Sequence, residues 1–405
     1  MPLLNRFNHL DALLTQTKAY WQLVAFETRC LPWSDTLNEW LMSLSDEQVT
    51  ELDNTPEKLL QALQHYIPQL QELELLLKLP FDKPNSETLP FWLSNGIKGR
   101  KLLQLQDFVG HIDELHFPIL EWCAGKGHLG RILAFNGAPH VHSIELQPAL
   151  CEQGQYSAKQ QNLSMSFSCA DVLKDDTQAY FEQQQHAVAL HACGRLHQVF
   201  MTEAVKAGCE KISLSPCCYH LFTDVQYQAM SDVGKNSTLA LQHSDMKLAL
   251  QETVTAPERI AKVRRKEVTW RLGFDALHRD VTGIDEYISV PSVNKAIFSQ
   301  SFEQFCGWAA AQKGITLPVN CDYDRYLHQG QQRKRITDRI ELVRHAFRRA
   351  IEIWLVLDRA LYLQAYGYDV VLREFCDKQL TPRNILIQAT ANQRKTHVLA
   401  RSPVR

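Results

Sequence analysis

The chain has 405 residues, of which 45% are hydrophobic and 22% charged, and its formal net charge is -2 at pH 7. This composition is ordinary for a globular protein and excludes global disorder. No run reaches the roughly 18 apolar residues that a membrane span needs, and the N-terminus lacks the pattern of an export signal. The 11 cysteines, an odd number, do not suggest a disulfide framework. We therefore expect a cytoplasmic protein with no membrane partner.

Residues 1–95 alternate apolar and polar positions at helical spacing, as in DTLNEWLMSL, which predicts a helical N-terminal region. A further helix follows a loop that contains Lys98, Arg100 and Lys101, and it precedes an apolar strand. A cation at that place can meet the carboxylate of a cofactor or the phosphate of a substrate, and Lys101 is the preferred one. The alternative is that these cations are simply solvated.

The segment PILEWCAGKGHLGRILAF, residues 118–135, predicts a strand, a glycine turn and an amphipathic helix. Gly125 and Gly127 allow the backbone to turn sharply, and the first turn of the next helix offers unpaired N–H groups to a nucleotide. GKGHLG matches the dinucleotide pattern GxGxxG, with Glu145 at about the spacing of a ribose-binding acid. Glu121, four residues before Gly125, instead suits the ammonium and sulfonium of S-adenosylmethionine, because a carboxylate would repel a pyrophosphate.

The same segment resembles motif I of class I methyltransferases, with Cys123 where the first glycine of the motif normally falls. Residues 140–146 predict a second strand that ends near Glu145, whose carboxylate can accept both ribose hydroxyls. A helix over 148–162 and a third strand follow, and the resemblance then implies adenine contacts from Asp171 and Val172. The alternative for Asp171 is a helix N-cap. The predicted cofactor-binding residues are Lys101, Glu121, Cys123, Gly125, Lys126, Gly127, Glu145, Leu146, Asp171 and Val172.

Two further strands, in residues 186–197 and 211–220, end in Cys and His at the same expected sheet edge. Their LHACG and CCYH elements resemble the branch of methyltransferase-like proteins with a CCYH motif, and more distantly the tRNA ribose 2′-O-methyltransferases. This likeness runs from about residue 96 to 390. It implies an acceptor site whose expected catalytic residues are His191, Cys193, Cys217, Cys218, Tyr219 and His220.

Several interpretations of this Cys and His group stay open. Cysteines at strand ends commonly pack beneath a ligand. SPCCY can instead form a substrate-side wall in which Tyr219 stacks on a base, or Cys217 can act as a nucleophile on a pyrimidine ring. Zinc is a further alternative, but the sequence lacks the CxxC or HxxxH pairs of structural zinc sites, and adjacent cysteines chelate one ion with strain. We therefore predict no metal site.

Two basic runs, PERIAKVRRKEVTWRLGFDALHR and QQRKRITDRIELVRHAFRRA, occur in a chain of almost neutral total charge. Such segregated charge is typical of a nucleic-acid binder, although a solvated helix face is an equal alternative. We expect the second run to begin a closing helix. Trp270, Phe274 and Leu277, at helical spacing, are expected in a core. Beyond them, residues 368–377 and 384–390 predict a strand pair, which is the closing hairpin of the methyltransferase sheet.

The sequence thus predicts an α/β fold with a Rossmann-like, seven-stranded class I methyltransferase sheet. The predicted regions are a helical N-terminal region (1–95), the core from motif I to the fifth strand (96–230), a basic helical insertion (231–335), and the closing helix and hairpin (336–405). The predicted function is S-adenosylmethionine-dependent methyl transfer to RNA, with tRNA as a narrower expectation. The alternatives are a protein methyltransferase, a non-catalytic scaffold that binds S-adenosylmethionine and RNA, and an NAD-linked oxidoreductase.

Overall fold

The computed structural model describes residues 1–82, 84, 88–222, 224–251 and 258–392 of the chain. Their contacts divide the chain into two compact units, each assembled from separate stretches. The first unit consists of Met1–Thr15, Leu73–Val254 and Arg349–Arg405, and the second of Gln16–Glu72 and Thr255–Arg348. The four predicted regions follow chain order instead, so their boundaries remain a prediction, and residues 393–405 of the last one lie outside the described residues.

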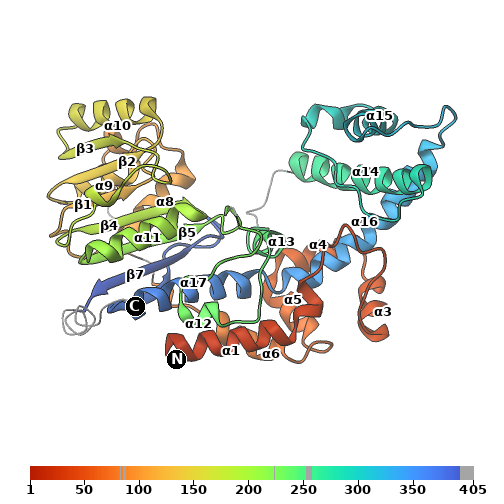
Figure 1. Cartoon of the computed structure of the whole chain (residues 1–405), viewed down its shortest axis with the longest axis horizontal. Helices are drawn as coiled ribbons and strands as arrows, with labels where there is room; N and C mark the ends of the chain where they lie inside the picture. The colour runs from red at the N-terminus through yellow and green to blue at the C-terminus, as the bar shows by residue number, and fades with distance from the viewer. Residues whose placement is uncertain (83, 85–87, 223, 252–257, 393–405) are drawn as a thin grey trace. The chain divides into compact units, whose positions relative to one another are not determined.

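The first unit contains a seven-stranded sheet in the order β3-β2-β1-β4-β5-β7-β6 (Figure 1). The first five strands run parallel, whereas β7 is antiparallel to both β5 and β6. This arrangement confirms the predicted fold class, including the closing hairpin. The strands are β1 (Ile119–Trp122), β2 (Val141–Glu145), β3 (Met165–Cys169), β4 (His186–Cys193), β5 (Lys211–Cys217), β6 (Tyr368–Glu374) and β7 (Ile385–Ala391).

Helices precede the sheet, alternate with its strands and form most of the second unit, so the predicted helical N-terminal region is confirmed. The α-helices are α1 (Leu3–Gln16), α2 (Lys18–Trp21), α3 (Asp35–Ser43), α4 (Asp46–Asn54), α5 (Pro56–Leu63), α6 (Leu70–Leu77), α7 (Phe91–Ser94), α8 (Gly99–Val109), α9 (His128–Phe135), α10 (Pro148–Gln160), α11 (Arg195–Ala207), α12 (Asp232–Lys235), α13 (His243–Leu248), α14 (Glu258–Thr282), α15 (Phe302–Lys313), α16 (Tyr323–His345) and α17 (Arg348–Ala365). Two 3₁₀ turns are η1 (Gln178–Tyr180) and η2 (Lys295–Ser299). Within the described part of the chain, none of these helices has the length and apolar character to cross a bilayer.

Both faces of the sheet are covered, which explains why its central strands are apolar. All four residues of β1 are buried. On one face, Phe108 of α8 and Ile132 of α9 share a core cluster with Ile119. On the other face, the Trp122 ring packs 5.9 Å from the ring of Phe200 in α11. The core therefore lies on both sides of β1 and leaves the carboxyl ends of the parallel strands as the edge where open α/β sheets bind ligands.

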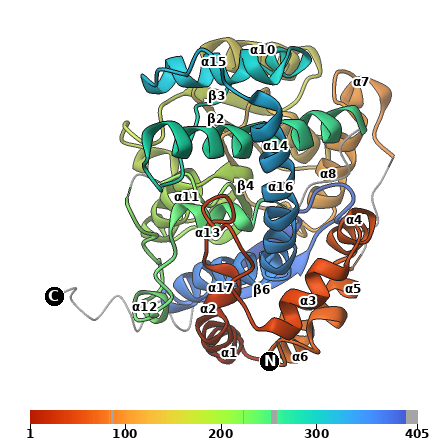
Figure 2. The same cartoon turned by 90° about the vertical axis from the view of Figure 1, so that its right-hand side faces the viewer.

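In the second unit, α14 and α16 cross each other closely (Figure 2). A Cβ built on Gly330 would lie 2.4 Å from the backbone oxygen of Thr269, so the crossing requires a glycine there. Trp270, Phe274 and Leu277 are buried in a core cluster with residues of η2 and α15. This confirms their expected place in a core.

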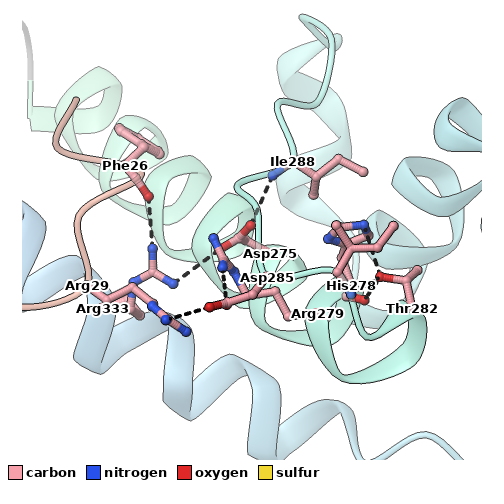
Figure 3. A network of polar contacts seen from close by, with 10 residues as sticks. Phe26, Arg29, Asp275, His278, Arg279, Thr282, Asp285, Ile288 and Arg333 are labelled. Atoms are coloured by element: carbon pink, nitrogen blue, oxygen red, sulfur yellow. Dashed lines mark hydrogen bonds and ion pairs between the residues drawn. The ribbon is translucent and has the colours of Figure 1, made fainter.

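A polar network joins α14 to α16 within the second unit (Figure 3). The Asp275 carboxylate is fully buried and accepts hydrogen bonds from the Arg279 and Arg333 guanidinium groups and from the Ile288 backbone N–H. Arg333 also donates to the Phe26 carbonyl oxygen. Because each cation here has an oxygen partner, the network holds the chain together and does not form a free basic patch.

Several cations of the second basic run are buried inside the protein, whereas Arg335 is exposed. The run also does not begin one helix, since α16 ends at His345 and α17 starts at Arg348. Arg339 is fully buried and donates to the Leu41 and Leu44 carbonyl oxygens, and Arg344 donates to the carbonyl oxygen of Trp21. These guanidinium groups satisfy backbone carbonyls at the ends of neighbouring segments, so they are not available to a nucleic acid.

Candidate functional site

The glycine turn between β1 and α9 has the backbone conformation that the sequence predicts. Gly125 and Gly127 have φ values of +61° and +66°, and Cys123 adopts the same left-handed region at +56°. A Cβ on Gly127 would lie 2.4 Å from Cζ of Phe167, whereas one on Gly125 would meet open space. The turn is therefore closed toward the protein at Gly127 and open at Gly125.

Glu121 lies beneath this turn and is 3% exposed. Its Oε2 accepts a hydrogen bond from the Ser143 hydroxyl at 2.7 Å, and its carboxylate also accepts one from the Gly130 backbone N–H. Burial raises the pKa of Glu121 to about 7, although these hydrogen bonds and the charge of Lys101 act in the opposite direction. Glu121 thus anchors the start of α9 to β2, and its contact with a cofactor remains a prediction.

Glu145 holds the other side of the turn. Its Oε2 accepts from the Gly125 backbone N–H at 2.9 Å, and its Oε1 accepts from the Gln147 backbone N–H at 3.0 Å. Leu146 and Lys126, at the same edge, are exposed. The carboxylate is consequently fixed beside the open side of the turn, and its contact with a ribose remains a prediction.

Lys101 lies on α8 near the same edge of the sheet. Burial lowers the pKa of Lys101, and its charge interacts with the acidic groups of Glu121 and Cys217. Lys101 is thus half-buried and within electrostatic reach of Glu121 and Cys217, and its contact with a cofactor remains a prediction. Lys98 and Arg100 are exposed.

Asp171 and Val172 follow the end of β3. The Asp171 carboxylate accepts from the Leu173 backbone N–H at 3.2 Å and pairs with the Lys174 ammonium at 3.0 Å. These interactions lower the pKa of Asp171. Val172 is buried. Asp171 thus stabilises a turn, not the start of a regular helix, and adenine recognition by this pair remains a prediction.

Three cysteines converge where β4 and β5 end. The ligand atoms of Cys193, Cys217 and Cys218 all lie within 4.8 Å of one another, and the Cys193 and Cys217 sulfurs are 3.5 Å apart. A register shift between Leu190 and Cys193 sets Cys193 opposite Cys217. Non-glycine residues at these strand ends have left-handed backbones, with φ of +63° at His191 and +47° at Cys218. Such conformations are costly and cluster at functional sites.

The two predicted histidines have different surroundings. His191 Nε2 lies 3.3 Å from the side-chain oxygen of Gln104, and burial lowers the pKa of His191 to about 4. His191 is therefore neutral at pH 7. His220 is half-buried, and its Nδ1 is among the buried atoms without a hydrogen-bond partner in the described part of the chain. Burial also lowers the pKa of His220, with Lys247 and His243 acting in the same direction.

Tyr219 does not offer a surface for base stacking, because it is 2% exposed. Its ring stands edge-on to the ring of His197, at 5.9 Å, and 5.0 Å from the guanidinium carbon of Arg359. His197 is itself buried between the Ala192 carbonyl oxygen and Arg359. Tyr219 supports the site from beneath. The interpretation in which its ring stacks on a base is therefore wrong, because a base cannot reach the ring.

The sequence did not identify the partners that hold these groups. Gln104 comes from α8, Ser143 from β2, and Arg359 from α17. Arg383, in the β6–β7 connection, interacts electrostatically with Cys218 and His191. None of these residues carries a local motif, since each reaches the site from a distant part of the chain.

Residues 100–225 match the family model described as a methyltransferase domain. Similar solved structures include geranyl diphosphate methyltransferase in complex with SAM, at 13% identity over 30% of this chain and 56% of that chain, with a TM-score of 0.25. A putative sarcosine dimethylglycine methyltransferase from Galdieria sulphuraria matches at 10% identity over 33% and 52%, with a TM-score of 0.26. A SAM-dependent methyltransferase from Aquifex aeolicus matches at 12% identity over 24% and 55%, with a TM-score of 0.21.

The chain thus spans little more than half the length of these structures, and no curated protein matches its sequence. The antiparallel β7 separates the sheet from the dinucleotide fold, whose six strands are parallel. The NAD-linked alternative therefore lacks its fold. By the family match, residues 100–225 form a methyltransferase domain, and the sheet that holds them ends in the antiparallel strand pair β6 and β7 that the sequence predicts.

Proposed function

We propose that this chain transfers methyl groups from S-adenosylmethionine to RNA. The observation that carries the cofactor assignment is the glycine turn whose open side at Gly125 is flanked by the fixed carboxylate of Glu145. When bound there, the cofactor supplies an activated methyl group on its sulfonium. In this proposal the turn holds its methionine part, Glu145 its ribose, and the segment at Asp171 and Val172 its adenine.

The remaining work of the protein is to position an acceptor and exclude water. The ends of β4 and β5 supply the groups at the acceptor side. The His191 proton lies on Nε2, since Gln104 Oε1 accepts it, and the lone pair is therefore on Nδ1. With a pKa of about 4, this imidazole is a weak base that can take part in orientation more readily than in full proton removal.

Calorimetric titration of the full chain with S-adenosylmethionine, S-adenosylhomocysteine and NAD tests the cofactor. The variant Gly125→Leu places a side chain in the open space of the turn, and Gly314→Leu is its matched control, since Gly314 has φ +65° and also faces open space. We expect the first two ligands to bind to wild type and to the control but not to Gly125→Leu. Binding of NAD alone, or equal binding by both variants, would contradict the proposal.

The support for RNA as the acceptor is a row of exposed cations on the first half of α14. Arg259, Lys262 and Arg264 are exposed there, whereas Arg339 and Arg344 of the second run are buried. Exposed cations attract phosphates and release counterions, which gives a binding energy that falls steeply with salt.

Transfer of a labelled methyl group from S-adenosylmethionine to total RNA and to total protein tests the acceptor. In the RNA arm, the triple serine variant of Arg259, Lys262 and Arg264 is compared with a triple serine variant of Lys58, Lys78 and Lys206, whose ammonium groups each pair with a carboxylate. We expect labelled RNA, and a lower affinity and a smaller salt dependence only in the α14 variant. Label in protein alone would favour a protein methyltransferase. RNA binding without methyl transfer would favour the scaffold.

A further inference from the structure

We propose that Cys193, Cys217 and Cys218 bind one zinc ion as a three-thiolate site at the ends of β4 and β5. This goes beyond the proposed methyl transfer and replaces the prediction, made from the sequence, of no metal site. Thiolates are soft ligands that select ions such as Zn²⁺. The three sulfurs come from two neighbouring strands and need no motif of the CxxC type to converge.

The distances suit tetrahedral zinc. A Zn–S bond of about 2.3 Å places two ligand sulfurs roughly 3.8 Å apart. The Cys193 and Cys217 sulfurs are 3.5 Å apart, and all three ligand atoms lie within 4.8 Å of one another. Rotations about side-chain bonds that move the sulfurs by up to about 1 Å are therefore enough to bring them around a common ion.

The backbone removes the objection that adjacent cysteines chelate poorly. In a regular strand, successive side chains point to opposite faces. Here β5 ends at Cys217, and Cys218 takes a φ of +47°, which turns its side chain back toward Cys217. The register shift after Leu190 brings Cys193 to the same place from β4. Two irregularities of the backbone thus produce one cluster of thiols.

The charges around the cluster also favour thiolates. Three thiolates and Zn²⁺ together carry a single negative charge. Lys101 interacts electrostatically with Cys217, and Arg383 with Cys218, so cations approach the cluster from α8 and from the β6–β7 connection. Neutral thiols that only packed against one another would gain nothing from these two charges.

The site has three protein ligands, because neither His191 nor His220 belongs to the convergent group in the described part of the chain. Zinc sites with three protein ligands keep a fourth position for water or substrate, whereas structural sites are closed by four. Cys123 of the glycine turn interacts electrostatically with Cys193. The open position would therefore lie on the acceptor side of the cofactor turn, where a bound ion can hold a nucleophile.

The test uses the full chain, reduced, freed of metal with a chelator and titrated with Co²⁺ as a spectroscopic substitute for zinc. We expect one ion per chain, a thiolate-to-cobalt charge-transfer band in the near ultraviolet, and displacement of Co²⁺ by Zn²⁺. Cys193→Ser, Cys217→Ser and Cys218→Ser should each lower the zinc affinity by more than the ~10- to 100-fold that changes in outer-shell partners cause. Cys30→Ser, at an exposed cysteine of the second unit, is the matched control and should bind as wild type does.

Because Cys217 is buried and its replacement can disturb folding, the half-buried Cys218 supplies the deciding variant. The circular dichroism of the Cys218→Ser variant and its affinity for S-adenosylmethionine report whether the domain is folded. Absence of a stoichiometric ion in wild type, or an unchanged charge-transfer band in a folded Cys218→Ser variant, would overturn the proposal. The metal titration needs no cofactor, so its failure is distinguishable from failure of the proposed methyltransferase function.

Discussion

Glu121→Gln should change how the stability of the methyltransferase domain depends on pH. Glu121 is 3% exposed, and burial raises the pKa of its carboxyl from the usual 4.5 to about 7. At pH values between 4.5 and about 7, the folded protein therefore keeps a proton on Glu121 that the unfolded chain releases. The free energy of unfolding therefore falls as the pH rises from 4.5 to about 7 and levels off above that range.

The size of this effect follows from the two pKa values. A tenfold change in proton affinity is worth about 1.4 kcal/mol, so a pKa of about 7 in place of 4.5 corresponds to about 3 kcal/mol of stability lost when Glu121 is ionised. Gln has nearly the same shape and can still accept the Ser143 hydrogen bond, but it does not titrate. The variant should gain up to about 3 kcal/mol relative to wild type across this pH range.

Urea unfolding at a series of pH values from about 5 to about 8 measures the difference. Hydrogen exchange of the amides of residues 118–135 assigns the change to the first unit. Glu152→Gln, at an exposed carboxyl on α10, is the matched control and should leave the pH dependence of wild type intact. The reasoning is refuted if wild type and Glu121→Gln lose stability in parallel as the pH rises.

Three further substitutions test the packing on which the two units depend. Gly127→Ala adds a Cβ 2.4 Å from Cζ of Phe167 at a φ of +66°. It should lower the free energy of unfolding in urea by about 1–3 kcal/mol. It should also weaken the binding of S-adenosylmethionine in calorimetry. Gly330→Ala adds a Cβ 2.4 Å from the Thr269 backbone oxygen and should lower the thermal unfolding temperature of the second unit without changing cofactor affinity; an unchanged temperature would contradict the close crossing of α14 and α16. Asp275→Asn removes the buried carboxylate that Arg279 and Arg333 share, although each guanidinium keeps a second oxygen partner. It should cost about 1.5–3 kcal/mol in a urea titration, and a cost within error of zero would show that the network is not stabilising.

The sequence predicts the sheet and the cofactor turn because both depend on local patterns. Apolar runs that end in Glu121 and Glu145 identify strands, and the positions of Gly125 and Gly127 identify a turn whose positive φ values the structure confirms. The closing hairpin is also readable, since two β-rich runs flank a short turn. These features need no knowledge of distant contacts, and they are the ones on which the methyltransferase assignment rests.

The interpretations that failed depend on contacts between distant segments. The charge of Arg339 is evident from the sequence, but its hydrogen bonds to the Leu41 and Leu44 carbonyl oxygens are not. In the sequence alone, a buried structural cation therefore looks the same as a cation that contacts a nucleic acid. Tyr219 has an aromatic ring after a strand, as a base-stacking residue would, yet packing against Arg359 buries it. Residue type thus predicts the chemistry that a side chain can do, while burial decides whether a ligand can reach it.

Cys123 connects the cofactor turn with the thiol cluster. It has a φ of +56° at a place where glycine would avoid the cost of roughly 1–2 kcal/mol that a side chain pays in the left-handed region. The Cys123 thiol lies close enough to Cys193 for their charges to interact, and burial raises the pKa of Cys123 to about 12. Cys123 is therefore a neutral thiol at pH 7, in contrast to the three proposed zinc ligands. If both proposals hold, replacing Cys123 with glycine should remove an uncharged, polarizable thiol that interacts with Glu145 of the turn and with Cys193 of the cluster.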